Sequence, residues 1–243
     1  MLDITKQDRF QIIVSDRQPA KLGAGGTATA EDSCVYYYAE KTGPELVSLQ
    51  LTTPHFLPTG DKKSVPIAEF LRRYRPEPLL YFNKALPAME ALQHTLSKAE
   101  SHLKNNRLDK AEATFKEALS LDKDNIKAVF GLGITYVSGG NTENAGEIFD
   151  KIMSLELAFS PEYTNMFNEF GIKMRKVGML DKALAYFRKA LEFNAQDENL
   201  YFNLARVYYE RKDDAKVLGC LDKALELAPG FLEAQKMKRF IAR

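Results

Sequence analysis

The sequence predicts a mainly α-helical protein in which four helix-turn-helix repeats and a C-terminal capping helix form an α-solenoid. A small α+β domain with a β-hairpin is expected before the repeats. Two observations support this fold class. Similar segments recur about every 34 residues in the C-terminal part, which is typical of stacked repeats. The N-terminal part lacks the repeat and contains short runs rich in β-branched and aromatic residues, which favour strands.

Residues 1–86 are predicted to form the α+β domain, with strands over about 10–15, 34–40 and 45–53. The sequence Lys-Thr-Gly-Pro joins the last two strands and predicts a hairpin turn. The segment between the first two strands is rich in Gly, Ala and Thr and predicts a loop. A phosphate-binding loop is not expected there, because no helix opens after its glycines, Gly23, Gly25 and Gly26.

A short helix is predicted over about 65–74, with Ser64 as its N-cap and Pro66 in its first turn. Residues 54–61 contain turn signals and are expected to be irregular. The prolines at 76 and 78 should end the helix, because proline removes a backbone donor. Helical periodicity resumes over 79–86, and we expect Pro87 to interrupt it.

Residues 87–243 are predicted to form the solenoid. Its repeats span about 92–125, 126–159, 164–197 and 198–231, and its capping helix spans 232–242. Each second helix has a column of small residues: Ala111, Ala145, Ala183 and Val217. Each also has a column of larger ones: Phe115, Phe149, Phe187 and Leu221. Small residues let paired helices approach closely, and large ones fill the space between successive repeats.

The first helices have columns of their own. Their small residues are Ala99, Gly133, Gly171 and Ala205, and a turn column follows at Asn106, Gly140, Gly178 and Lys212. Four extra residues separate the second and third repeats, and we expect them to lengthen the entry to the next helix. The basic residues of the last helix should be solvated, as suits the end of a repeat array.

The charge, the cysteines and the absence of known motifs exclude several classes of function from what we expect. The formal net charge of +1 provides no bulk field for nucleic acid or an anionic membrane, so neither is expected as a partner. No signal-peptide core or membrane span is apparent, and two distant cysteines favour reduced thiols in the cytoplasm. The histidines form no ligand spacing with the cysteines, and no catalytic motif is found. We therefore expect no metal, no cofactor and no catalytic residue, and we do not expect an enzyme.

The repeated residues quoted above resemble the tetratricopeptide repeat (TPR) family over roughly the C-terminal three-fifths of the chain. Residues 1–86 carry no such resemblance. The resemblance implies a right-handed solenoid that acts as a protein-interaction scaffold. In this family, the first helix of each pair lines a concave groove that binds a peptide or a partner helix.

The implied groove residues lie on the first helices, on the face opposite the small column. They are Lys127, Phe130, Ile134 and Val137 in the second repeat, Asn165, Asn168, Ile172 and Arg175 in the third, and Asn199, Phe202, Asn203, Arg206 and Tyr209 in the fourth. Spacings of three and four residues keep each set on one stripe. An equally good interpretation of Phe130, Ile134 or Phe202 taken singly is packing between neighbouring first helices.

The first functional hypothesis is a cytoplasmic scaffold of bacterial type that binds a segment of a partner protein in the groove. The alternative is a self-associating assembly protein, a homo-oligomer or a chain whose groove holds its own apolar segment Pro78–Leu86. A secretion-type chaperone is a less favoured variant of the first hypothesis. An enzyme or small-ligand site in residues 1–86 is disfavoured, because no convergent polar cluster is apparent there.

Overall fold

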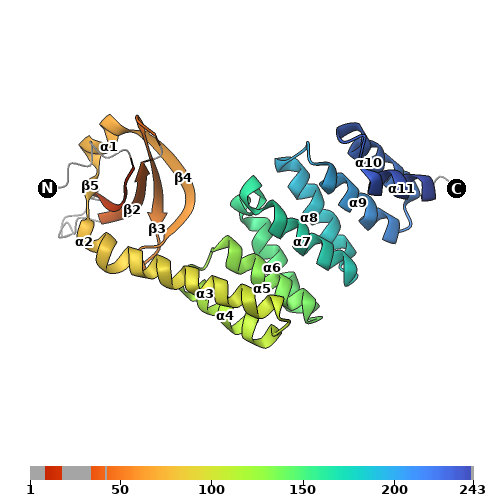
Figure 1. The fold of residues 1–243 in the computed structure, drawn as a ribbon, viewed down its shortest axis with the longest axis horizontal. Coiled ribbons are helices and arrows are strands. Elements are labelled where there is room, and N and C mark those ends of the chain that lie inside the picture. The colour runs from red at the N-terminus through yellow and green to blue at the C-terminus, as the bar shows by residue number, and fades with distance from the viewer. Residues whose placement is uncertain (1–8, 18–33, 42, 242–243) are drawn as a thin grey trace, which may run out of the picture. The chain divides into compact units, whose positions relative to one another are not determined.

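The computed structural model describes residues 9–17, 34–41 and 43–241 (Figure 1). The glycine cluster Gly23, Gly25 and Gly26 lies outside the described residues. The chain divides into two compact units. Unit 1 comprises residues 1–97 and 117–125, and unit 2 comprises residues 98–116 and 126–243. The predicted domain boundary at 86/87 stays a prediction.

Unit 1 contains a five-stranded antiparallel sheet in the order β4-β3-β2-β1-β5. The strands are β1 (Gln11–Arg17), β2 (Cys34–Lys41), β3 (Leu46–Thr52), β4 (Pro58–Pro66) and β5 (Arg75–Pro76). The expected hairpin is confirmed, because β2 and β3 pair in antiparallel register with Lys41 opposite Val47. Alternating side chains along β1 reach opposite faces of the sheet.

Helix α1 (Ile67–Arg73) covers one face of the sheet. The core on that face consists of Phe10, Val14, Ala39, Val47, Leu49, Val65, Phe70 and Tyr74. A second cluster contains Ile13, Tyr38, Tyr81 and Ala85. Val14 and Ile13 are adjacent in β1 and enter different clusters, as the strand period of two requires. The sheet is therefore packed against helical residues on both faces.

Strand β4 was not expected. Residues 58–61 were predicted to be irregular and Ser64 to cap a helix, but β4 runs through both and pairs with β3. The helix begins at Ile67, and its N-cap position, Pro66, makes no side-chain cap bond. Most residues of β4 are exposed, because it is an edge strand, and prolines lie at both ends of it. Edge strands tolerate proline and charge, and such residues hide a strand from sequence reasoning.

The predicted interruption at Pro87 is also wrong. Helix α2 (Pro78–Leu80) continues through a π-helical turn, Tyr81–Ala85, directly into α3 (Leu86–Lys104), which contains Pro87. The Leu86 N–H donates to the Tyr81 carbonyl, five residues back. In an α-helix the proline ring would collide with the carbonyl four residues before it. A wider turn just before the proline is a known way for a helix to pass such a residue.

The remaining helices confirm the predicted fold class of paired repeat helices. They are α4 (Leu108–Leu121), α5 (Ile126–Ser138), α6 (Thr142–Ser154), α7 (Thr164–Lys176), α8 (Leu180–Phe193), α9 (Glu198–Glu210), α10 (Asp214–Leu227) and α11 (Leu232–Ile241). Within unit 2, α5 contacts α7 and α7 contacts α9, while α6 contacts α8. First helices therefore form one layer and second helices the other (Figure 1).

The recurring columns are the core of this packing. Every residue in the small and large columns of the second helices is buried, as are Ala99, Gly133, Gly171 and Ala205. The turn column has one backbone conformation throughout, with φ of +53° at Asn106, +73° at Gly140, +81° at Gly178 and +59° at Lys212. In the last repeat, Asp213 N–H bonds to the Tyr208 carbonyl and Lys212 N–H to the Tyr209 carbonyl. This is a Schellman ending, which closes the first helix and starts the second.

The extra residues between the second and third repeats form two short 3₁₀ turns, Glu156–Phe159 and Pro161–Tyr163. The second turn leads directly into α7. Phe159 is buried, and its ring stacks on that of Phe193 at a centroid distance of 5.4 Å. The insertion therefore adds an aromatic side chain to the core between repeats.

Replacing Gly171 with alanine is expected to lower the free energy of unfolding of unit 2 by about 1–2 kcal/mol. A Cβ atom at Gly171 would lie 2.6 Å from Phe187 Cζ and 3.0 Å from Tyr186 Cδ1. Both rings are fully buried and cannot move aside freely. The overpacking outweighs the better helix propensity of alanine, and urea unfolding followed by far-UV circular dichroism measures the difference.

The matched control is Gly219→Ala in α10, where an added Cβ meets no atom within 4 Å. That variant should be stabilised by up to about 1 kcal/mol, since it gains only helix propensity. If both variants shift stability in the same direction, close approach at Gly171 is not the reason for its glycine.

Candidate protein-binding face

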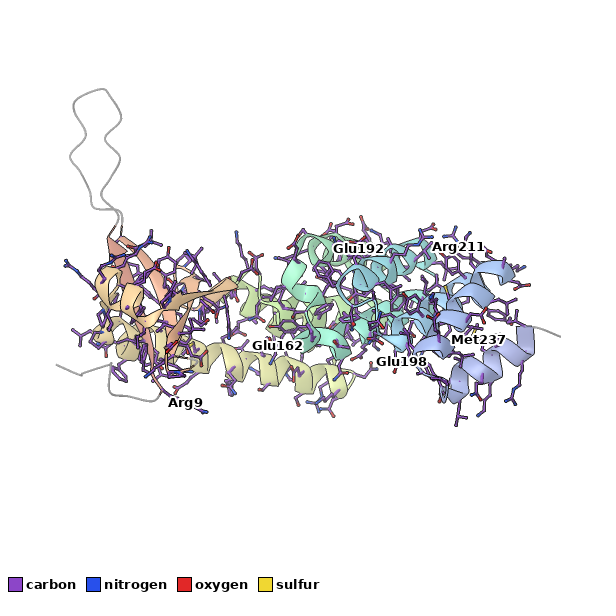
Figure 2. The ribbon with its side chains drawn as sticks, turned by 90° about the horizontal axis from the view of Figure 1, so that it is seen from above. Arg9, Glu162, Glu192, Glu198, Arg211 and Met237 are labelled. Atoms are coloured by element: carbon purple, nitrogen blue, oxygen red, sulfur yellow. The ribbon has the colours of Figure 1, made fainter. Side chains whose placement is uncertain are left out.

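The predicted groove residues lie on α5, α7 and α9, the first helices of the last three repeats. Figure 2 shows the side chains along these helices, with Glu198 and Arg211 marking the two ends of α9. We call the side of α5, α7 and α9 that carries these residues the first-helix face. The residues differ strongly in accessibility from one repeat to the next.

Of the four predicted groove residues in the second repeat, only Lys127 is exposed. Phe130, Ile134 and Val137 are buried, and the Phe130 ring contacts that of Phe170 in α7 at 6.3 Å between centroids. These three side chains pack between helices in this structure. Of the two interpretations given to Phe130 and Ile134, burial favours packing over direct contact with a partner.

The third and fourth repeats leave more of the set accessible. Asn165, Asn199 and Tyr209 are exposed, while Asn168, Ile172, Phe202 and Arg206 are half-buried. Asn203 is buried and donates from Nδ2 to Asn168 Oδ1 at 3.2 Å, which joins α9 to α7. The structure thus brings polar amides and an accessible arginine together on neighbouring first helices.

Arg175, Arg206 and Glu210 lie close together on α7 and α9. Arg175 is buried and forms an ion pair with Glu210 across α7 and α9. Arg206 lies one helical turn before Glu210, with its guanidinium carbon 5.8 Å from the centroid of the Phe202 ring. The pKa of Arg206 is lowered, first by burial and then by the nearby Arg175, while Glu210 opposes this. These three groups together carry two positive charges and one negative charge.

Two aromatic residues that sequence reasoning missed complete the face. Phe231, just before α11, packs its ring on Phe202 at 5.0 Å, and Phe240 of α11 packs on Tyr209 at 6.3 Å. Phe240 is 64% exposed and Tyr209 is 42% exposed. The last helix had been interpreted only through its charged residues. Phe231 just before this helix and Phe240 within it were the available signal, because both are large apolar residues.

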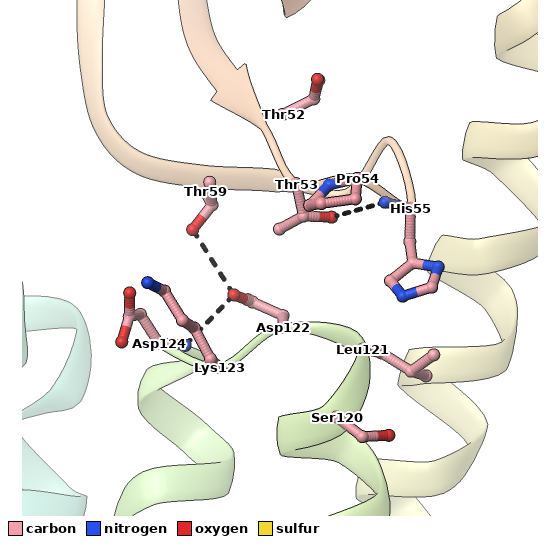
Figure 3. A pocket seen from close by; sticks show the side chains of 10 residues that line it. All are labelled: Thr52, Thr53, Pro54, His55, Thr59, Ser120, Leu121, Asp122, Lys123 and Asp124. Carbon is pink, nitrogen blue, oxygen red and sulfur yellow. Dashed lines mark hydrogen bonds between the residues drawn. The ribbon is translucent and has the colours of Figure 1, made fainter.

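Unit 1 contains a separate hollow of about 360 Å³ (Figure 3). Residues 52–55, Thr59 and residues 120–124 line it. Asp122 is buried and accepts hydrogen bonds from Thr59 Oγ1, Asp124 N–H and Asn125 Nδ2 at 3.3–3.4 Å. Its carboxylate thus ties the turn after α4 to strand β4. That role is structural.

The described residues offer neither an activated thiol at Cys220 nor a cluster of metal ligands. Burial raises the pKa of Cys220 to about 11, so its thiol is protonated at neutral pH and is a weak nucleophile. No group of three or more His, Cys, Asp or Glu side chains suited to a metal ion occurs among residues 9–17, 34–41 and 43–241. In the same ranges, no helix combines the length and apolar character needed to cross a bilayer.

Comparison with known proteins agrees with the repeat architecture. The family model described as "Tetratricopeptide repeat" matches residues 102–164 and 175–239, more than half of the chain. Anaphase-promoting complex subunit 3 of Schizosaccharomyces pombe is 21% identical over 160 residues, which are 65% of this chain and 24% of that protein. The present chain therefore spans about a quarter of that relative.

Two solved structures show the same fold. The MamA protein is 21% identical with a TM-score of 0.50, and the match covers 63% of this chain and 81% of that chain. PilF of Pseudomonas aeruginosa is 16% identical with a TM-score of 0.50, covering 64% of this chain and 69% of that chain. At these identities the likeness concerns the fold alone. The matched family model and the buried repeat columns together lead to one conclusion: the chain belongs to the tetratricopeptide repeat family.

Proposed function

We propose that the chain is a protein-interaction scaffold that binds a segment of a partner protein on its first-helix face. The observation that supports this most directly is the change in accessibility along the repeats. The second-repeat residues Phe130, Ile134 and Val137 are buried, whereas Asn199, Arg206 and Tyr209 of α9 reach solvent. A surface that offers aromatic rings beside amide and guanidinium donors is suited to a peptide.

Family membership supports the same proposal, because repeats of this kind are commonly interaction modules. The relative from Schizosaccharomyces pombe is subunit 3 of the anaphase-promoting complex. For the present chain, we infer only that its partner is a protein or a peptide. Arg175 and Asn203 are buried and connect α7 to α9, so they are not proposed as contacts of the partner. The proposed binding residues are Lys127, Asn165, Asn168, Ile172, Asn199, Phe202, Arg206 and Tyr209.

Self-occupancy of the face by Pro78–Leu86 is the competing idea. Tyr81 and Ala85 of that segment are buried against Ile13 and Tyr38 of the sheet in unit 1. The same side chains cannot at once fill a face in unit 2. Occupancy by a second copy of the chain remains an outcome that the experiment below can return.

The proposal is tested by placing a photoreactive amino acid at Asn199 in the full chain, expressed in the cells from which it comes. Asn199 is exposed on α9. Illumination should link it to a partner protein that mass spectrometry identifies. The matched control is Ala185, an exposed residue of the second helix α8, which should give no such product.

Each other outcome has a defined meaning. A product that contains two copies of this chain favours the self-associating alternative. Equal products from Asn199 and Ala185, or none from either, contradict the assignment of the first-helix face.

A further inference from the structure

We propose that the end of the first-helix face recognises an acidic segment of the partner. A carboxylate of the partner binds Arg206, and apolar side chains of the partner contact the aromatic pairs beside it. This inference rests on the proposed function and names the chemistry of the ligand. We call the surface formed by Phe202, Arg206, Tyr209, Phe231 and Phe240 the α9–α11 face.

The aromatic pairs lie on either side of Arg206 along α9. Phe202, Arg206 and Tyr209 follow at spacings of four and three residues, so they share one stripe of the helix. Phe231 packs on Phe202 at one end of the stripe, and Phe240 packs on Tyr209 at the other. An accessible guanidinium thus lies between two aromatic contacts that join the last repeat to α11.

Arg206 has no ion-pair partner among the described side chains, in contrast to its neighbours. Arg175 is paired with Glu210, and Arg211 is paired with Asp181. Glu210 is the carboxylate nearest to Arg206 in the helix, one turn on, and its oxygen already accepts from Arg175. Two guanidinium groups therefore share one carboxylate. A partially buried cation in this position is stabilised when an external carboxylate approaches it.

The surrounding charges favour the same ligand. Helix α11 contains Lys236, Lys238 and Arg239 and a single acidic residue, Glu233. Lys238 is paired with Asp222 of α10, which leaves Lys236 and Arg239 to contribute positive potential. Charge complementarity with an acidic segment would raise its rate of association and reject basic segments.

A carboxylate suits this site better than a nucleic acid does. The planar guanidinium of arginine presents two N–H groups that match a carboxylate. Nucleic-acid binding needs several cations that follow the phosphate backbone. Here Arg206 lies between apolar rings, so the neighbouring contacts are suited to leucine-like or aromatic side chains. Oligonucleotide binding is kept as an outcome of the test.

The experiment selects peptides from an unbiased phage-displayed library on the full chain, in parallel with the Arg206→Gln variant. The wild-type chain should enrich Asp or Glu next to large apolar residues, and the variant should lose the preference for acid. The matched control is Arg107→Gln, because Arg107 is an exposed arginine that lies outside the α9–α11 face. That control should keep the wild-type preference.

A labelled copy of the most enriched acidic peptide then measures the interaction by fluorescence anisotropy. Replacing Arg206 with glutamine, or the peptide acid with glutamine, should each weaken binding about tenfold, and both changes together little more than one. Arg206→Lys should bind with intermediate affinity, because lysine keeps the charge but not the planar fork. Circular dichroism checks that each variant is folded.

Several results would overturn the inference. Enriched peptides without acidic residues, equal affinity of the wild-type and Arg206→Gln chains, or tighter binding of a labelled oligouridine would each do so. A selection that enriches no peptide also contradicts it. Since the photocrosslink at Asn199 does not depend on an acidic ligand, a partner captured there together with any of these results leaves the proposed function standing and removes only the acidic ligand.

Discussion

Replacing Tyr186 with alanine should lower the free energy of unfolding of unit 2 by about 3–5 kcal/mol, which is the range for removing a buried aromatic ring. Tyr186 is fully buried and is the aromatic side chain around which the second and third repeats pack. Its ring lies within 6.4 Å, centroid to centroid, of the rings of Phe149, Phe159, Phe167, Phe170 and Phe187. Alanine would leave a cavity among rings that come from several helices and cannot close together over it.

The control is Tyr186→Phe, which keeps the ring. The Tyr186 hydroxyl is buried and has no hydrogen-bond partner among the described protein groups, and burial raises its pKa well above the ordinary value. Phenylalanine removes that polar group, so the variant should be at least as stable as the wild type. Urea unfolding monitored by far-UV circular dichroism compares the variants. A loss in Tyr186→Phe as large as in Tyr186→Ala would show that the hydroxyl, and not the ring, holds the repeats together.

The repeat could be predicted from the sequence because its constraint is local and recurs. Ala183 and Gly171 are small for the same reason as Ala145 and Gly133, namely the close approach of two helices, and each copy reinforces the alignment. The same regularity extends to the turn column, which includes Lys212 in a conformation that favours glycine. The backbone conformation that the repeat requires at this turn is therefore adopted even by a lysine, which ordinarily avoids positive φ.

Unit 1 contains no repetition and was predicted less completely. Strand β4 is exposed, carries lysines and is bounded by prolines, so its propensity does not identify it, and only pairing with β3 does. The π turn before Pro87 arises from a conflict between a proline and a helix that is packed on the sheet through Tyr81 and Ala85. Ile13 and Tyr38, on which Tyr81 and Ala85 pack, lie far before them in the sequence, so periodicity could not reveal that the helix continues.

The accessibility of the first-helix face also could not be predicted from the sequence. A stripe of residues on a first helix can be located by spacing, but spacing does not say whether the stripe is covered. Phe130 and Phe202 occupy equivalent places, yet Phe130 is buried against α7 and Phe202 is half-buried against Phe231. The difference arises because α7 packs on α5, whereas the rings that contact this side of α9 are those of Phe231 and Phe240.

Replacing Arg73 with methionine should lower the stability of the sheet in unit 1 by about 3 kcal/mol, because a buried carboxylate would lose its cation. Asp16 of β1 is 3% exposed, and Arg73 of α1 donates to its Oδ2 from Nε at 2.9 Å and from Nη2 at 2.6 Å. The hydrogen bond to Asp16 is also the main reason why the pKa of Arg73 is raised. Hydrogen exchange measured by mass spectrometry should show faster exchange in peptides from β1 and β2.

The neighbouring arginine provides the control. Arg72 is exposed on the same helix, and no ion pair to it occurs among the described residues, so Arg72→Met should change stability by less than about 0.5 kcal/mol. Adding Asp16→Asn to Arg73→Met should recover part of the loss, because the buried group is then neutral. Recovery would show that the cost lies in the unpaired carboxylate and not in the lost packing of the arginine side chain. If the double variant is as unstable as the sum of the two single variants, Asp16 and Arg73 do not act as a pair, and α1 must be held on the sheet by its apolar contacts through Ile67 and Phe70.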